Sequence, residues 1–222
     1  MIELKQTQGK LIQIEKEKEA ENIRLRISRD IHDDIGGNLT KIALLSDITA
    51  SNTQQNSPET LHTLSRISDY SRNVNTSLSE IVWAITPKHD SLDSLLVFMR
   101  AHIHKMFEGA GITYQINFPE QYQNHPLHPD LKRNIFLVLK ESLNNILKYA
   151  QAKNVDVSFS IDGDNFEMKI KDDGIGFDLH QKQETGNGLQ NMKFRAEQSN
   201  GVFSIHSKPN SGTEIIASGL LF

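Results

Sequence analysis

Two long helical patterns separated by a short polar break dominate the first third of the chain. In the first, apolar residues recur at steps of three and four, which places them along one face of a helix and predicts that this face is buried. We call this face the apolar stripe; it comprises Ile27, Ile31, Ile35, Leu39, Ile42, Leu45 and Ile48.

The second helical pattern begins after Ser57-Pro58-Glu59, which supplies an N-cap, a proline at the first helical position and an early negative charge. It ends at Thr86-Pro87, because a residue before proline is pushed out of the helical region. Two helices joined by a short turn predict an antiparallel hairpin, and each has more apolar face than one partner covers. Dimerisation into a four-helix bundle is therefore expected. The second seam comprises Leu61, Leu64, Ser68, Ser71, Val74, Leu78, Ile81 and Ile85.

His32 lies one residue from Ile31 of the apolar stripe, so its imidazole should stand at the edge of the buried face and contact water. A neighbouring carboxylate, Asp33 or Asp34, can hold one ring N–H and leave the other nitrogen free as a nucleophile. The alternative is an ordinary histidine on a polar helix face. Gly36 and Gly37 follow in the middle of the expected helix, where each glycine lowers helix stability by about 1 kcal/mol relative to alanine. Either close helix packing or the approach of a bulky reactant would explain them.

Composition narrows the classes of function. The net charge of −4 argues against a nucleic-acid-binding surface, and the absence of cysteine excludes disulfides and sulfur-based metal sites. No apolar run approaches the roughly 20 residues that span a bilayer, and no secretory signal opens the sequence. These features suit a soluble protein of a reducing cytoplasm.

The second half alternates between helical and strand patterns. Helices are expected over 92–108, 130–150 and 189–199, and strands over 112–118, 155–161, 166–170, 202–206 and 214–217. These elements predict an α/β sandwich with a mixed sheet and helices on one face, so that the whole chain has an α+β multidomain fold.

The helix expected over 130–150 carries the first of three runs with chemical character. Glu141, Asn145, Lys148 and Tyr149 share roughly one helical face. A carboxylate, an amide oxygen and an ammonium are the groups that Mg²⁺ bound to a polyphosphate requires. Taken alone, this run favours the solvated face of an amphipathic helix.

The other two runs are rich in glycine. In Lys171-Asp172-Asp173-Gly174-Ile175-Gly176, an aspartate can accept a hydrogen bond from an amine such as that of adenine, while the glycines let the backbone pass under a flat ring. In Gly186-Asn187-Gly188-Leu189, a glycine-rich loop opens a helix whose free N–H groups suit a phosphate. Each glycine pair alone could be an ordinary turn, and neither run is a Walker A or dinucleotide-binding motif.

Taken in this order, the three runs resemble the N, G1 and G2 boxes of the GHKL ATP-binding fold, over about residues 92–222. The stretch Arg26-Ile27-Ser28-Arg29-Asp30-Ile31-His32-Asp33-Asp34-Ile35-Gly36 is similar to the phosphoacceptor box of the NarX/DesK-like two-component sensor histidine kinases, which signal to NarL-type response regulators. Together the two resemblances span nearly the whole chain.

The resemblance implies a role for each residue. His32 would be the phosphoacceptor and Asp33 the base that polarises it. Glu141 and Asn145 would position Mg²⁺, whereas Lys148 would contact phosphate. Tyr149 would lie near the adenine or ribose, Asp172 would bind the adenine amine, and Thr213 would support Asp172. The implied ATP-binding set is Glu141, Asn145, Lys148, Tyr149, Asp172, Gly174, Gly176, Gly186, Gly188, Leu189 and Thr213.

The resemblance also predicts the organisation of the chain. A signalling helix is expected over 1–25, the phosphotransfer hairpin over 26–87, a linker over 88–91 and the ATP-binding domain over 92–222. Residues 177–185 would form a short lid. The implied cofactors are ATP and Mg²⁺, and the implied partners are a second copy and the receiver domain of a NarL-type regulator. The chain would be the cytoplasmic portion of a membrane-bound sensor kinase whose sensor region is absent here. Two rival functions remain: a GHKL protein-serine kinase and a nucleotide-binding dimerisation module.

Overall fold

The computed structural model describes residues 16, 18–25, 27, 35, 37–52, 58–179, 188–198 and 200–221. The chain divides between residues 89 and 90 into two compact units, which are described separately below. Several assignments from the sequence lie outside the described residues, among them Ile31, His32, Asp33, Asp34, Gly36, Gly186, residues 1–15 and 17 of the expected signalling helix, and the part of the expected lid from residue 180 onward.

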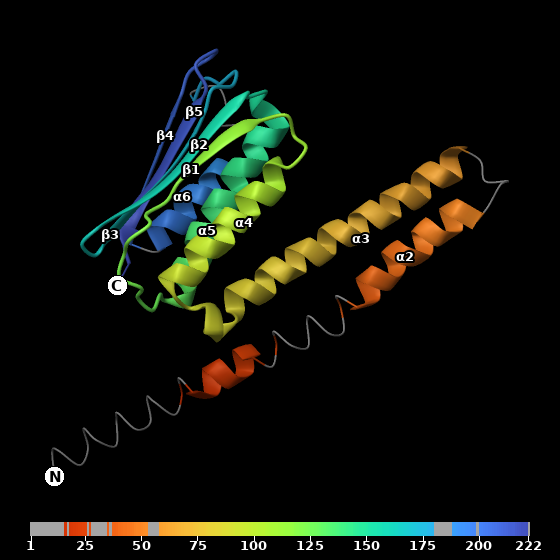
Figure 1. Ribbon diagram of the computed structural model, residues 1–222, viewed down its shortest axis with the longest axis horizontal. Helices are drawn as coiled ribbons and strands as arrows, with labels where there is room; N and C mark the ends of the chain where they lie inside the picture. Colours follow the sequence, from red (N-terminus) through yellow and green to blue (C-terminus); the bar gives the residue numbers. More distant parts are fainter. Residues whose placement is uncertain are drawn as a thin grey trace, which may run out of the picture. The chain divides into compact units, whose positions relative to one another are not determined.

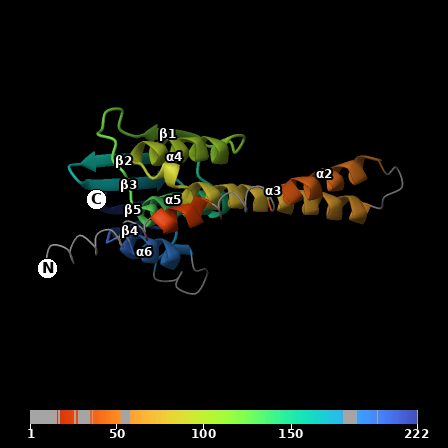
Figure 2. The ribbon, with the colours of Figure 1, turned by 90° about the horizontal axis from the view of Figure 1, so that it is seen from below.

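The first unit is helical. Residues 18–25 are helical, and two longer helices follow, α2 (Gly37–Asn52) and α3 (Pro58–Ile85). The two views in Figures 1 and 2 both show α2 and α3 side by side. Polar side chains join these two helices: Arg72 donates to Asp47 at 2.9 Å, and Asn75 donates to Thr40 at 3.1 Å. A 3₁₀ turn, Pro87–His89, follows α3 at the proline that the sequence identifies as its end.

Small residues form the contact between α2 and α3. Ala43 and Ser46 of α2 and Ser68 and Ser71 of α3 are all buried. Most of the described apolar stripe lies outside this contact, and its members Ile27, Ile35, Ile42, Leu45 and Ile48 are 44–62% exposed. The burial expected for the stripe is therefore not achieved within one chain, because α3 packs on the row of small side chains beside it.

The second unit contains a five-stranded mixed sheet with the strand order β1-β2-β3-β5-β4. The β1–β2 pair is parallel and the other pairs are antiparallel, so the mixed sheet expected from the sequence is confirmed. Its elements are α4 (Leu92–Phe107), β1 (Thr113–Asn117), α5 (Pro129–Asn145) with a π-helical turn (Ile146–Ala150), β2 (Asn154–Asp162), β3 (Asn165–Asp172), α6 (Gly188–Gln198), β4 (Val202–Ser207) and β5 (Thr213–Leu220).

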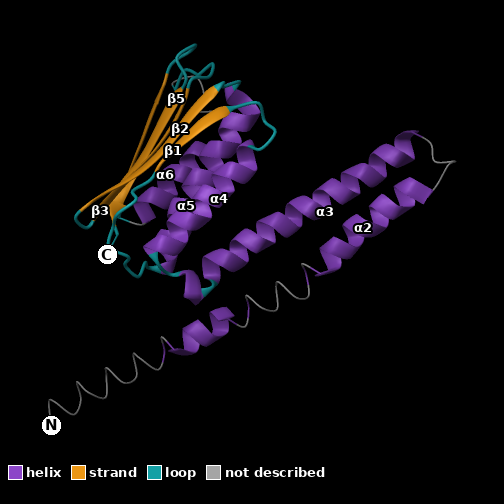
Figure 3. Cartoon of the chain, viewed as in Figure 1, coloured by secondary structure: helices purple, strands orange, loops and turns teal. Residues whose placement is uncertain are grey.

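Helices α4, α5 and α6 lie on one face of this sheet (Figures 1 and 3). Alternation along the strands explains the core, because every second side chain faces the helices. On β3, Phe166, Met168 and Ile170 are buried while the intervening residues are not. The helices contribute fully buried residues such as Met99 and Leu139. Each such side chain stabilises the fold by about 1.5–3 kcal/mol relative to leaving it exposed.

Asp173 fastens the end of β3 to the start of β2. Its Oδ1 accepts the backbone N–H groups of Lys153 and Asn154 at 2.8 and 2.9 Å, and its Oδ2 accepts the Asn154 amide at 2.7 Å. The hydrogen bonds from Asn154 and Lys153 hold the pKa of the Asp173 carboxyl below its ordinary value of 3.8. Folding therefore favours the charged carboxylate at this position.

We predict that Asp173→Ala lowers the melting temperature at neutral pH, because three hydrogen bonds to a carboxylate are lost. Since the folded pKa is depressed, this contribution is present above about pH 3.8 and fades as the pH falls below it. Thermal melts of both proteins between pH 3 and 7 should converge at the acid end. Asp162→Ala is the control, because Asp162 is exposed and accepts from Asn165 through its backbone carbonyl, which the substitution retains. A gap between wild type and variant that is independent of pH would contradict this account.

Candidate functional site

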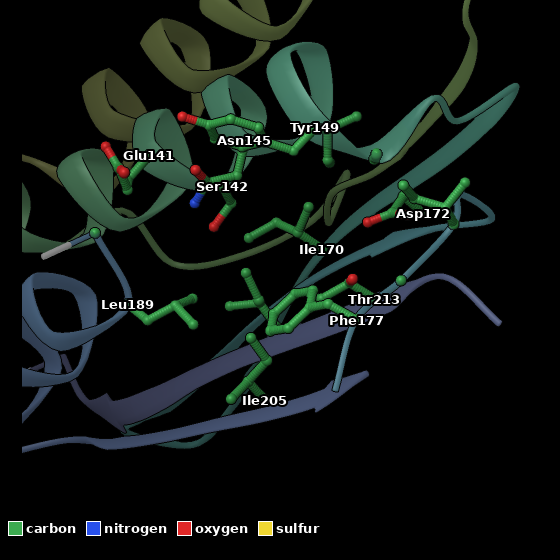
Figure 4. Close-up of a pocket in the computed structure, with 16 residues that line it drawn as sticks. Glu141, Ser142, Asn145, Tyr149, Ile170, Asp172, Phe177, Leu189, Ile205 and Thr213 are labelled. Atoms are coloured by element: carbon green, nitrogen blue, oxygen red, sulfur yellow. The ribbon is translucent and has the colours of Figure 1, made fainter. Parts of the chain in front are cut away.

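A cavity of about 550 Å³ opens where the end of α5 faces the sheet. This volume lies in the range of small-molecule sites. The walls come from four places: the end of α5 with its π-helical turn, the end of β3 with the turn after it, the start of α6, and the facing strands β4 and β5 (Figure 4). The lining residues are Glu141, Ser142, Asn145, Ile146, Tyr149, Ala150, Ile170, Asp172, Ile175, Gly176, Phe177, Gly188, Leu189, Ile205, Thr213 and Ile215.

The end of α5 differs from the sequence expectation. A single α-helix is predicted over 130–150, but the α-helix ends at Asn145 and a π-helical turn continues to Ala150. Such turns advance each residue by less than the roughly 100° of an α-helix and are frequent at functional sites. Lys148 is consequently rotated further from the direction of Asn145 than an α-helix would place it. Asn145 and Tyr149 line the cavity, whereas Lys148 is exposed and is not among the lining residues.

Two predicted glycines shape the turn after β3, and both are required there. A Cβ on Gly174 would collide with the carbonyl oxygen of Ala150, and one on Gly176 would collide with that of Lys208. Gly176 also has φ +56°, which side chains rarely adopt. The turn is tied on both sides, because Ile175 N–H donates to Ala150 at 2.8 Å and Gly212 N–H donates to the carbonyl of Gly174 at 2.8 Å.

Asp172 is the buried carboxylate of the cavity, with 5% of its surface exposed. Burial raises the pKa of its carboxyl above 3.8, while hydrogen bonds from the backbone of Gly174 and Thr213 act in the opposite direction. One of these, from Gly174 N–H to Oδ1, is 2.9 Å long. A buried carboxylate oxygen in an open cavity can accept a hydrogen bond from an amine of a ligand.

Oxygen ligands lie toward the other end of the cavity. In Figure 4, Glu141 and Leu189 lie far from Asp172, and Asn145 projects from the same helix as Glu141. Gly188 begins α6, and a Cβ there would meet the carboxylate of Glu141, so the start of this helix lies against that side chain. Carboxylate and amide oxygens are hard ligands suited to Mg²⁺, and a helix start suits phosphate. The donor set therefore fits a magnesium polyphosphate.

The structure brings together eight of the eleven residues expected to bind ATP: Glu141, Asn145, Tyr149, Asp172, Gly176, Gly188, Leu189 and Thr213. Gly174 lies directly behind the lining, in contact with the carboxylate of Asp172. Lys148 is exposed, and Gly186 lies outside the described residues.

Sequence reasoning missed the apolar part of the lining and a polar group behind it. Ile170, Ile205 and Ile215 line the cavity from the strands, where the period of two places them on the same face as the core. Ser207 accepts Phe177 N–H at 2.9 Å, and its Oγ lies 3.0 Å from the hydroxyl of Thr213. The alternation along β3, β4 and β5 could have identified the three isoleucines from the sequence, whereas no local pattern marks Ser207.

Two kinds of feature are absent from the part of the chain that the structure describes. Among these residues, no group of three or more His, Cys, Asp or Glu side chains is placed to hold a metal ion. Among the helices that the structure describes, none is both long and apolar enough to cross a bilayer.

Comparison with known families matches two consecutive parts of the chain. Residues 24–90 match the family described as histidine kinase, and residues 131–219 match the histidine kinase-, DNA gyrase B- and HSP90-like ATPases. His32 falls within the first match, and the cavity residues fall within the second.

Individual relatives agree with these matches. The histidine-protein kinase/phosphatase DegS of Brevibacillus brevis is 29% identical over 201 residues, covering 89% of this chain and 51% of the relative. The oxygen sensor histidine kinase NreB of Staphylococcus carnosus is 31% identical over 198 residues, covering 87% and 55%. Sensor histidine kinase DesK of Bacillus subtilis is 28% identical, covering 86% and 49%. The chain thus spans about half the length of these curated relatives.

A solved structure shows the same fold. The histidine kinase domain of the Erythrobacter litoralis EL346 blue-light activated kinase superposes with a TM-score of 0.53 at 14% identity, over 83% of this chain and 94% of that domain. Two family matches, over residues 24–90 and 131–219, and relatives that align across most of the chain lead to one assignment. The chain belongs to the two-component sensor histidine kinases of the NarX/DesK-like subfamily.

Proposed function

We propose that this protein transfers the γ-phosphoryl group of ATP to His32 and then to an aspartate of a response regulator. The observation that carries the proposal is the cavity itself, which has a buried acceptor at one end and oxygen ligands beside a helix start at the other. The two ends of the cavity suit the two ends of a nucleotide, because an adenine amine needs a hydrogen-bond acceptor, whereas phosphates need a cation or free N–H groups. The family match over residues 24–90, within which His32 lies, supports His32 as the nucleophile in the same chain.

The pose of ATP follows from the cavity. The adenine amine would donate to Asp172, with Tyr149 beside the base or ribose and the strand isoleucines beneath the ring. The phosphates would lie near the start of α6, where Gly188 lies against the carboxylate of Glu141. Glu141 and Asn145 would hold Mg²⁺, which when bound neutralises charge on the phosphates. Lys148, although exposed, has a long side chain and would contact the phosphates.

Phosphoryl transfer depends mainly on how the histidine and the γ-phosphoryl group are positioned. His32 attacks the γ-phosphorus with the lone pair of one imidazole nitrogen, the bond to the bridging oxygen breaks, and ADP leaves. Asp33 would hold the proton on the other nitrogen and stabilise the charged ring. In the second step the phosphoryl group passes from His32 to an aspartate carboxylate of the regulator, which regenerates the neutral histidine.

We also infer that the helical unit forms a homodimeric four-helix bundle. The exposed apolar stripe on α2 supports this, as do Leu61, Ile67, Val74 and Ile81 on α3, which are 39–50% exposed. A second copy would cover both faces. A NarL-type regulator as partner, and a cytoplasmic position beneath a membrane-anchored sensor region, remain predictions from membership of the family.

We predict that His32→Gln abolishes incorporation of label from γ-labelled ATP and leaves ATP affinity within about twofold, because the ATP-binding residues lie in the other unit. The label on the wild type should be acid-labile and alkali-stable. The matched control is His62→Gln, an exposed histidine on α3. Acid-stable, alkali-labile label would favour a protein-serine kinase instead, and ATP binding without any labelling would favour a nucleotide-binding dimerisation module.

We predict that Asp172→Asn weakens ATP binding by about tenfold or more, because the amide presents an N–H to the adenine amine. Without nucleotide the variant should be at least as stable as the wild type at neutral pH. Burial raises the pKa of Asp172, so the charged carboxylate opposes folding above about pH 3.8. Calorimetry of ATP binding and thermal melts measure the two effects. Asp156→Asn, on the β1–β2 edge, is the control for the same chemical change. Equal affinity would exclude this pose.

We predict that Leu45→Glu, at the most exposed described position of the apolar stripe, converts a dimer into a monomer. Each dimer would bury two carboxylates against apolar side chains, which is costly. Light scattering at micromolar concentration measures the mass. The control is Val97→Glu on α4, an apolar residue of similar exposure in the other unit, which should leave the mass unchanged. A wild-type monomer would refute the bundle.

A further inference from the structure

Lys132, near the start of α5, is fully buried and charged. No part of its surface is exposed, and its Nζ lies 2.7 Å from Oδ1 of Asp90, a side chain that is 18% exposed. Moving an ammonium group out of water is costly, and a buried ion pair gains little stability over apolar side chains of similar volume. The ATP pose and the transfer chemistry use neither residue. A costly pair at this point therefore calls for a role other than stability.

Asp90 is the first residue of the second unit. From this residue onward the chain is fastened to the loop that precedes α5. Leu127 N–H donates to the carbonyl of Asp90 at 3.1 Å, and Leu92 N–H donates to the carbonyl of His125 at 2.9 Å. The side chains of Asp93 and Tyr122 continue this contact, with a hydrogen bond of 2.9 Å. We call residues 90–93 the entry segment.

The ion pair connects the entry segment to a helix, which the backbone hydrogen bonds do not. The backbone bonds hold it to a loop, whereas Lys132 holds it to α5, which continues to Glu141 and Asn145 at the cavity. A helix is a stiff connection, so the pair fixes the entry segment relative to the elements that carry the nucleotide site. Asp90 is thereby held within the second unit, directly after the 3₁₀ turn Pro87–His89.

We propose that Lys132 is a positioning residue: through Asp90 it fixes the point at which the linker enters the ATP-binding unit, and so sets how ATP is presented to His32. This inference rests on the proposed function. It predicts that loss of the pair lowers the rate of phosphoryl transfer while the affinity for ATP is retained, because the nucleotide cavity itself is unchanged.

The test compares Lys132→Met, Asp90→Asn and the double variant in the full chain. Asp90→Asn leaves a buried ammonium without its carboxylate and should lower the melting temperature most. The double variant removes both charges and should recover a melting temperature close to that of wild type. Its autophosphorylation kcat should nevertheless stay about tenfold or more below wild type, with KM for ATP within about twofold. A purely structural pair would recover activity together with stability.

A second measurement reports on the entry segment directly. Hydrogen exchange should accelerate at the amides of Leu92 and Leu127 in the double variant, while peptides from β2 and β3 keep their wild-type rates. Lys132→Arg should retain part of the wild-type rate. The matched control is Lys169→Met on β3, which breaks a half-exposed ion pair with Glu167 and should change neither kcat nor exchange at the entry segment.

The outcomes separate this inference from the proposed function. If the wild type forms no acid-labile phosphoprotein, the proposed function fails, and the exchange measurement alone tests whether the pair fixes the entry segment. If the wild type is phosphorylated and the double variant matches it in kcat, the positioning role is refuted. Unchanged exchange at Leu92 and Leu127 would refute it as well.

Discussion

The carbonyl oxygen of Ala150, which accepts the N–H of Ile175, joins the helix end to the turn after β3. This contact leaves no room for a side chain on Gly174, and the Lys208 carbonyl on the opposite side leaves none on Gly176. The turn is therefore clamped between a helix end and the β4–β5 connection. Asp172 stands at the base of this clamp, and its carboxylate is held in place by the turn that it introduces. The position of the acceptor is consequently set by backbone geometry, which tolerates little change.

The two adjacent aspartates at this turn, Asp172 and Asp173, have different environments and pKa shifts of opposite direction. Asp172 is buried and its pKa is raised, so its charge opposes folding and is available to a ligand. Asp173 is exposed, accepts three hydrogen bonds across the sheet, and its pKa is lowered, so its charge supports folding. Asp172 is the last residue of β3 and Asp173 is the first residue of the turn, so one carboxylate lines the cavity while the next binds the start of β2. Burial, and to a smaller extent the charge of Asp173, raises the pKa of Asp172, so the neighbouring carboxylate adds to the cost of charging the functional one.

Much of the second unit could be predicted from sequence because its signals are local. The alternation of β2 and β3 around Gly163, and the glycines before Asn165 and after Asp172, identify strands and turns without tertiary information. The π-helical turn after Asn145 could not be predicted, since it depends on how the helix end meets the turn at Gly174. Within that turn Lys148 is exposed and is not among the residues that line the cavity.

Polar contacts between residues far apart in the sequence could not be predicted either. Lys132 and Asp90 are 42 positions apart, and in the sequence Lys132 reads as one more charge on an amphipathic helix. Ser207 and Thr213 meet only because β4 and β5 are paired. Periodicity reports which face of an element is apolar, but it does not report which polar group will be enclosed when elements meet.

The two units differ in how much of their apolar surface a single chain buries. The α/β unit encloses its core, with residues such as Leu95, Met99 and Met168 fully buried, so its nucleotide cavity needs no second copy. The helical unit buries small residues between α2 and α3 and leaves its larger apolar side chains exposed. Covering those side chains, by a second copy as proposed, would stabilise the helices, whereas the cavity depends on contacts within its own unit. A change in the packing of the helices could therefore alter the proposed phosphoryl transfer while nucleotide affinity stays the same, which is the separation that the proposed signalling role requires.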